Sequence, residues 1–162
     1  MIVLGIDPGF TAAGFAIIQK NGHQSQLLDC GFLATPPSKH LSERVGLFYN
    51  FFSEKIKMYQ VTDIALETPF LGKNAQNFLK LGYLRGIIYL LANQYTIHLH
   101  EFAPREVKLS LTGFGGASKD QVARVILQLF PKLIKPNKYD VTDALAITLC
   151  GLWKNKHSLL MR

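Results

Sequence analysis

The chain has few cysteines and no long apolar run. Its two cysteines, Cys30 and Cys150, stand far apart in apolar surroundings without a Cys-x-x-Cys pairing, so both are predicted to be buried free thiols. No apolar stretch reaches the roughly 18 residues of a membrane helix. The apolar residues 1–4 follow no basic segment, so they are predicted to begin a strand and not a signal peptide. We expect a cytoplasmic protein without a membrane partner.

Internal repeats, low-complexity tracts and linkers are also missing from the sequence. At 162 residues the chain is long enough to bury about two thirds of the surface that its unfolded form exposes. We therefore expect residues 1–162 to form a single domain around one core.

Acidic residues are scarce. Asp and Glu total 11 against 18 Lys and Arg, and the net charge is +7. Four of these acids, Asp7, Glu67, Asp140 and Asp143, stand where predicted elements end or begin, and without them seven acids face 18 basic residues. A basic surface favours a nucleic-acid or anionic-membrane partner. The pattern indicates a polyanion held over metal ions in an acidic pocket.

Hydrophobic periodicity predicts an α/β order of elements. Three consecutive strands at the start are typical of an antiparallel meander. Ser38 and Ser118 are predicted to cap helices, and Pro104 to open a short one. Strands are expected at residues 2–7, 14–19, 26–33, 63–67 and 96–102, and longer helices at about 38–59, 74–93, 118–130 and 139–154.

The four acids are suited to metal-dependent chemistry. Asp7 and Glu67 each close an apolar run, and the two meet if the first and fourth strands pair. Asp140 and Asp143 share one helix face. Clustered carboxylates raise each other's pKa, and divalent cations remove the conflict. Oxygen ligands suit Mg²⁺ or Mn²⁺, and two ions about 4 Å apart are the arrangement for phosphodiester hydrolysis. Taken singly, Asp7 could be a turn former and Asp143 an ordinary helix acid.

Five motifs stand in order along nearly the whole chain: Leu4-Gly5-Ile6-Asp7-Pro8-Gly9 with Gly14, Glu67-Thr68-Pro69-Phe70 with Lys73-Asn74, Val107-Lys108, Ser118-Lys119, and Asp140-Val141-Thr142-Asp143-Ala144-Leu145-Ala146. Together they resemble the RuvC family of Holliday junction resolvases. The resemblance implies an RNase H-like α/β fold with a mixed five-stranded sheet flanked by helices. It also implies a homodimer that uses Mg²⁺ to nick opposed strands of four-way DNA junctions.

The family resemblance also implies residue roles. Asp7, Glu67, Asp140 and Asp143 are the expected catalytic ligands of two Mg²⁺ ions per site, which Mn²⁺ can replace, and the products carry 5′ phosphates. Lys119 is expected to join them in catalysis and, with Lys108, to lie near the scissile phosphate. Phe70 is expected to wedge against bases at the junction centre. The remaining expected DNA contacts are Lys73, Asn74, Lys132, Lys135 and Lys138.

Two features depart from the usual pattern of the family. The chain ends soon after the last predicted helix, and Thr68 and Pro69 follow Glu67. A compact, diverged chain of this kind resembles a phage-encoded resolvase of the lactococcal-phage type, which would act in the host cytoplasm. These departures leave open whether branch-migration proteins are partners and which DNA sequence is cleaved.

Three other functions are alternatives to a junction resolvase. Another RNase H-like nuclease would act on forks or flaps with the same acids. An ATP-binding module would share the strand ending in Gly5-Ile6-Asp7, but it needs a second lobe and a second phosphate turn that the sequence lacks. A junction-binding protein without catalysis would lose the acids. Because all four acids are present, a nuclease is favoured.

The predicted helix over residues 74–93 is apolar nearly all round. Helices of this kind are buried on more than one side. Gly82 and Gly86, four residues apart, would let another backbone approach closely. The sequence therefore predicts a twofold dimer built on this helix, and the alternative is a central helix enclosed within one domain.

Overall fold

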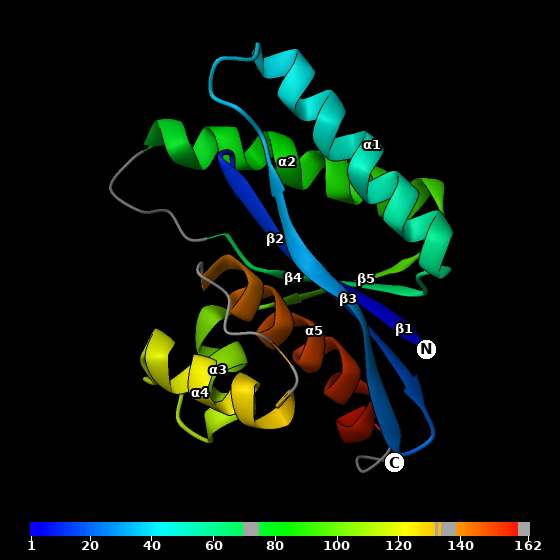
Figure 1. The fold of residues 1–162 in the computed structure, drawn as a ribbon, viewed down its shortest axis with the longest axis vertical. Coiled ribbons are helices and arrows are strands. Elements are labelled where there is room, and N and C mark those ends of the chain that lie inside the picture. The colour runs from blue at the N-terminus through cyan, green and yellow to red at the C-terminus, as the bar shows by residue number, and fades with distance from the viewer. Residues whose placement is uncertain (70–74, 132, 134–138, 159–162) are drawn as a thin grey trace.

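A mixed sheet of five strands organises the computed structural model, which describes residues 1–69, 75–131, 133 and 139–158. The strand order is β3-β2-β1-β4-β5, in which β1 pairs antiparallel with β2 and parallel with β4 (Figure 1). β2 and β3 pair antiparallel, and β4 and β5 pair parallel. The strands are β1 (Ile2–Asp7), β2 (Ala12–Asn21), β3 (Gln24–Ala34), β4 (Asp63–Glu67) and β5 (His98–Phe102).

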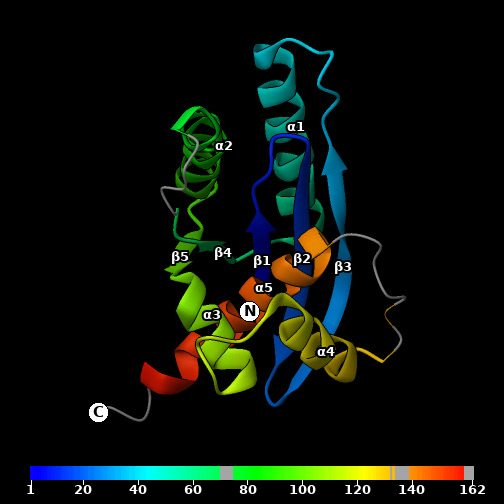
Figure 2. The same ribbon diagram turned by 90° about the vertical axis from the view of Figure 1, so that its left-hand side faces the viewer.

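Helices cover both faces of the sheet. In Figure 1, α1 and α2 lie on one side and α3, α4 and α5 on the other, and the view in Figure 2 shows the same separation. No helix in the described ranges is long and apolar enough to cross a membrane. The helices are α1 (Leu41–Tyr59), α2 (Ala75–Gln94), α3 (Pro104–Thr112), α4 (Lys119–Leu129) and α5 (Tyr139–Ser158).

The ends of several elements differ from the prediction. α1 begins at Leu41 after His40, and not after Ser38, because the Glu43 carboxylate accepts the His40 backbone N–H at 3.0 Å and so satisfies the helix start. The β2–β3 hairpin is longer than predicted, since its polar residues also pair. β5 starts at His98 because Thr96 has a positive φ of 54°. Ser118 caps α4 and Pro104 opens α3, as predicted.

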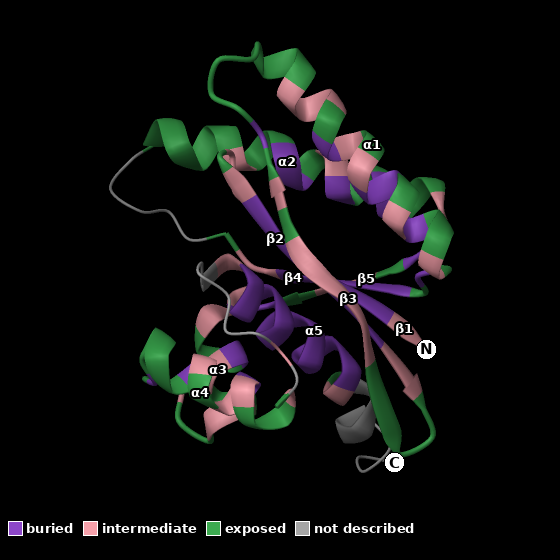
Figure 3. Cartoon of the chain, viewed as in Figure 1, coloured by how far each residue is buried: buried purple, intermediate pink, exposed green. Residues whose placement is uncertain are grey.

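The buried side chains form two clusters and not one core. One lies between the sheet and α3, α4 and α5, and the other between the sheet and α1 and α2. The sheet separates them because helices pack on both of its faces. Figure 3 shows that α5 is buried along most of its length, so α5 is the central helix of the first cluster.

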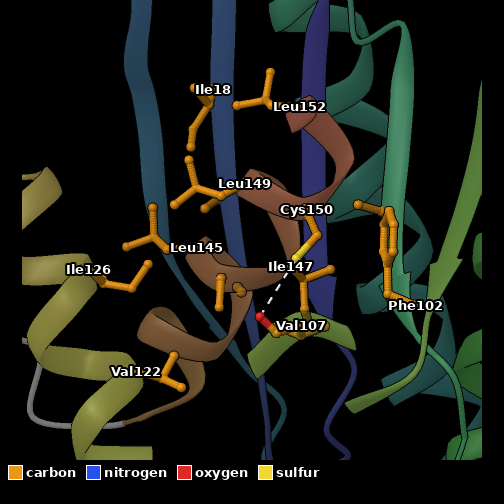
Figure 4. Close-up of a cluster of buried hydrophobic side chains, with 14 of the residues drawn as sticks. Ile18, Phe102, Val107, Val122, Ile126, Leu145, Ile147, Leu149, Cys150 and Leu152 are labelled. Carbon is orange, nitrogen blue, oxygen red and sulfur yellow. Dashed lines mark hydrogen bonds between the residues drawn. The ribbon is translucent and has the colours of Figure 1, made fainter. Parts of the chain in front are cut away.

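The two cysteines are both free, as predicted. Cys30 is half-buried, whereas Cys150 lies inside the cluster around α5, 4.0 Å from the carbonyl oxygen of Val107 (Figure 4). Burial raises the pKa of the Cys150 thiol to about 11. A thiol with so high a pKa is unreactive near neutral pH, so Cys150 contributes to packing.

Candidate active site

Asp7 and Glu67 lie at the ends of two neighbouring parallel strands. β1 and β4 pair in the register Ile6↔Leu66, so the next residues, Asp7 and Glu67, come side by side at the same edge of the sheet. This confirms the predicted pairing of the first and fourth strands. The two carboxylates therefore meet although 60 residues separate them in the sequence.

α5 carries the other two acids and lies unusually close to the sheet. A Cβ on Gly5 of β1 would lie 2.1 Å from Thr148 Oγ1, and one on Gly14 of β2 would lie 2.0 Å from the carbonyl oxygen of Asp140. Neither position has room for a side chain. The two glycines thus let the start of α5 rest on β1 and β2, which brings its acids toward Asp7.

These elements enclose a cavity of about 240 Å³ that is lined by acids and lysines. Asp7, Glu67 and Asp143 line it together with Lys108 of α3 and Lys119 of α4. Asp140 does not line the cavity, but its charge helps to raise the pKa of Asp7. The rest of the wall consists of Pro104, Val107, Val122 and Ala146.

Negative charge dominates the electrostatics of the cavity. Burial raises the pKa of Asp7 to about 7, and repulsion from Asp143, Glu67 and Asp140 adds to the rise. The pKa of Glu67 is also raised, first by burial and then by Asp143. Lys119 offsets part of this repulsion, because its Nζ donates a hydrogen bond of 2.6 Å to Asp143 Oδ2. This bond raises the pKa of Lys119, which stays charged.

The chemistry of the donors fits a hard divalent cation. All candidate ligands are carboxylate oxygens, which Mg²⁺ and Mn²⁺ prefer. Within the described part of the chain, no three His, Cys, Asp or Glu side chains converge closely enough to form a finished metal site. Burial is the largest cause of the raised pKa of Asp7, and a divalent cation would remove the repulsion from the neighbouring acids that adds to it. The assignment of the four acids as metal ligands therefore stays a prediction with a chemically suitable donor set.

Several predicted DNA contacts lie outside the described residues. These are Phe70, Lys73, Asn74, Lys132, Lys135 and Lys138. Their roles stay predictions. Lys108 and Lys119 are the two predicted DNA-binding lysines that the described structure brings to the acids.

The sequence analysis missed the residues that support the carboxylates. Val107 and Ala146 stood in the motifs without an assigned role, although Ala146 follows Asp143 by three residues and so shares its helix face. Val122 was not singled out at all. Arg85, whose Nη1 donates to the carbonyl oxygen of Glu67 at 2.6 Å, was also missed. The sequence did single out Arg85, because it is the sole charged residue between Lys80 and His98 in an otherwise apolar and neutral stretch.

Asp7→Asn is expected to stabilise the metal-free protein above pH 7. Because the folded-state pKa of about 7 exceeds the ordinary value of 3.8, the folded protein binds the extra proton, and its stability falls as pH rises from about 4 to about 7. Asparagine does not ionise, so this loss disappears. In EDTA, the melting temperature of the variant should exceed that of the wild type by about 2–4 °C or more at pH 8 and by less at pH 5. The same difference at both pH values would contradict the expectation.

Comparison with known proteins places the chain among nucleases. The family model described as "Crossover junction endodeoxyribonuclease RuvC" matches residues 3–151. Proteins of that name from Chlorobium phaeovibrioides and Pelodictyon phaeoclathratiforme are each 43% identical to this chain. Each match covers 94% of this chain, with 81% of the first relative and 80% of the second. Both relatives are bacterial proteins, and the phage origin stays a prediction.

A solved structure supports the same relationship. The Thermus thermophilus RuvC in complex with a Holliday junction substrate matches with a TM-score of 0.90 and 27% identity, over 98% of this chain and 96% of that chain. The structural match, together with the mixed five-stranded sheet, confirms the RNase H-like α/β fold.

Proposed function

The chain belongs to the RuvC family of crossover junction endodeoxyribonucleases, and from this premise we propose that it resolves four-way DNA junctions by nicking opposed strands. One observation carries the proposal. The cavity gathers Asp7, Glu67 and Asp143 from three separate elements, and Lys108 and Lys119 belong to the same lining, in a protein of net charge +7. Carboxylates can bind the metal ions used in phosphodiester hydrolysis, and lysines in a basic protein can bind the phosphate.

We further propose that Asp7, Glu67, Asp140 and Asp143 hold two Mg²⁺ ions, which Mn²⁺ can replace. When bound, such ions neutralise phosphate charge and lower the pKa of water. Lys108 and Lys119 line the same cavity as Asp7 and Glu67, and their charges complement a phosphate. The apolar side chains of Val107, Val122 and Ala146 limit the water in the cavity and so strengthen these interactions. Products with 5′ phosphates are expected.

The partner of each chain is proposed to be a second copy that docks on α2. Leu84, Ile88 and Leu91 of α2 are buried against the sheet, whereas Leu79 and Leu90 are 58% and 51% exposed. A groove of about 790 Å³ between the start of α1 and the middle of α2 has mainly apolar walls, and its lining includes Gly82 and Gly86 of α2. A four-way junction presents two equivalent strands, and a C2 dimer supplies two equivalent active sites.

The remaining features of the proposal follow from the same function. Residues 1–162 are proposed to act as one nuclease domain in the cytoplasm, which is the host cytoplasm if the chain is phage-encoded. Phe70, Lys73, Asn74, Lys132, Lys135 and Lys138 are proposed DNA contacts. No membrane partner is proposed, and branch-migration proteins stay undecided as partners.

Cleavage of defined DNA substrates tests the proposed function. Synthetic four-way junctions, replication forks, flaps and linear duplexes would be incubated with the protein and Mg²⁺, with EDTA as the control. Paired nicks in opposed strands of the four-way junction, and little cleavage of linear duplex, are the expected result. Preferred cleavage of forks or flaps would favour the alternative nuclease. Tight junction binding without cleavage in either Mg²⁺ or Mn²⁺ would favour a non-catalytic binding protein.

A further inference from the structure

A buried arginine links α2 to the strand that carries Glu67. Arg85 is only 6% exposed, although α2 lies on the face of the sheet opposite the catalytic cavity (Figure 1). Burying a guanidinium costs several kcal/mol unless its N–H groups are paired. The contacts of Arg85 therefore show which groups this side chain holds in place.

The two arms of the guanidinium bind two neighbouring strands. Nη1 donates to the main-chain carbonyl oxygen of Glu67 at 2.6 Å. Nη2 forms an ion pair with Glu101 of β5 and also donates to the Tyr89 hydroxyl at 3.2 Å. The Tyr89 hydroxyl in turn donates to Glu101 Oε1 at 2.9 Å. The ion pair with Glu101 thus fixes the direction of Arg85, and the other arm is directed at Glu67.

The contact with Glu67 occurs at the end of the strand. Glu67 is the last residue of β4, and the pairing Glu67↔Phe102 is the last one between β4 and β5. Beyond it, the N–H of Thr68 donates to the carbonyl oxygen of Phe102 at 2.8 Å. The Glu67 side chain lines the cavity on one face, while its carbonyl is held by Arg85 from the other. Displacement of a reacting group by about 1 Å can cost about 100-fold in rate.

We propose that Arg85 is a positioning residue, which fixes the Glu67 carboxylate in the catalytic cavity by holding the main-chain carbonyl of the same residue. The proposal rests on the proposed nuclease function. In this arrangement the position of α2 on one face of the sheet affects the geometry of the metal ligands on the other face. Hydrogen-bonded supports of metal ligands typically contribute about 10–100-fold to metal affinity or activity.

The competing role is structural, in which Arg85 only ties α2 to β5 through Glu101. Two substitutions separate the roles. Arg85→Lys keeps the charge but has no planar fork, so it cannot hold both the Glu67 carbonyl and Glu101 in the same way. Tyr89→Phe removes one hydroxyl that contacts both Arg85 and Glu101 and leaves the bond from Arg85 to Glu67 in place. It is the matched control.

The test compares metal dependence in both variants and the wild type. Arg85→Lys is expected to lower the rate of junction cleavage about 10–100-fold, to raise the Mg²⁺ concentration at half-maximal rate, and to leave the Kd for the junction in EDTA within about twofold. Without DNA, the rise in melting temperature on adding Mn²⁺ should be smaller than in the wild type. Tyr89→Phe should retain the wild-type Mg²⁺ dependence and Mn²⁺ response, with at most a lower melting temperature.

Two results would overturn the positioning role. The first is a folded Arg85→Lys variant with wild-type Mg²⁺ dependence and Mn²⁺ response. The second is an equal loss of both in Tyr89→Phe, because that substitution does not touch Glu67. A wild-type protein that cleaves no branched DNA would instead refute the proposed function. In that case the Mn²⁺ response without DNA still decides whether Arg85 supports the site.

Discussion

Asp7→Asn is expected to abolish junction cleavage while junction binding persists. Asp7 is the most strongly perturbed acid of the cavity, with a pKa raised to about 7 by burial and by three neighbouring carboxylates. Its neutral amide would remove one negative charge from the proposed metal ligands without changing the shape of the side chain. We expect the single-turnover cleavage rate to fall by about 10³-fold or more, since even indirect supports of metal ligands contribute up to about 100-fold.

The junction Kd and a control variant show whether Asp7→Asn loses cleavage through the chemical step and not through DNA binding. The Kd of the Asp7→Asn variant for the four-way junction in EDTA should equal or fall below that of the wild type, because one negative charge beside the DNA is gone. Glu54→Gln removes one charge from an exposed position of α1 and serves as the control, with wild-type cleavage expected. Near-normal cleavage by Asp7→Asn would refute the assignment of the cavity as the active site.

Gly82→Glu is expected to convert the proposed dimer into a monomer that no longer makes paired nicks. A Cβ at Gly82 meets no atom within 4 Å, so the folded protomer has room for a side chain there. In a C2 interface both subunits contribute the same patch, so each copy would bring a new carboxylate into the proposed interface. Like charges brought together at an interface cost several kcal/mol, which corresponds to about 100-fold or more in the dimer Kd.

Sedimentation and a junction nicking assay measure the two consequences. The variant should sediment as a monomer at micromolar concentration and release singly nicked junctions, whereas the wild type nicks both strands within one binding event. Asn50→Glu places the same charge on an exposed position of α1 and should remain a dimer. A wild-type protein that is monomeric throughout, yet cuts both strands in one binding event, would refute the dimer.

Local sequence signals were enough to find the acids and the strands that carry them. β1 and β4 have the predicted bounds, because each is a short buried apolar run that stops at a carboxylate. The spacing of Asp140 and Asp143 placed both at the start of one helix, as observed. The resemblance carried by these segments supplied the family and its fold, which the comparisons confirmed.

Element ends were less predictable where a side chain decided them. Ser38 has the residue type of a cap, but the Glu43 carboxylate bonds to His40 and sets the start of α1 there. The polar ends of β2 and β3 carry no apolar alternation, and their pairing across the hairpin extends both strands. In each case a specific contact outweighed a residue preference.

Only the tertiary structure decided how the acids are supported. The sequence shows an arginine in an apolar helix, but it does not show that the guanidinium reaches the carbonyl of Glu67, 18 residues earlier. It shows lysines, but the 2.6 Å bond between Lys119 and Asp143 depends on how α4 packs against α5. Burial and electrostatic repulsion arise between residues distant in the chain. Residue types and spacing therefore determined which groups carry the chemistry, and packing determined their pKa values and positions.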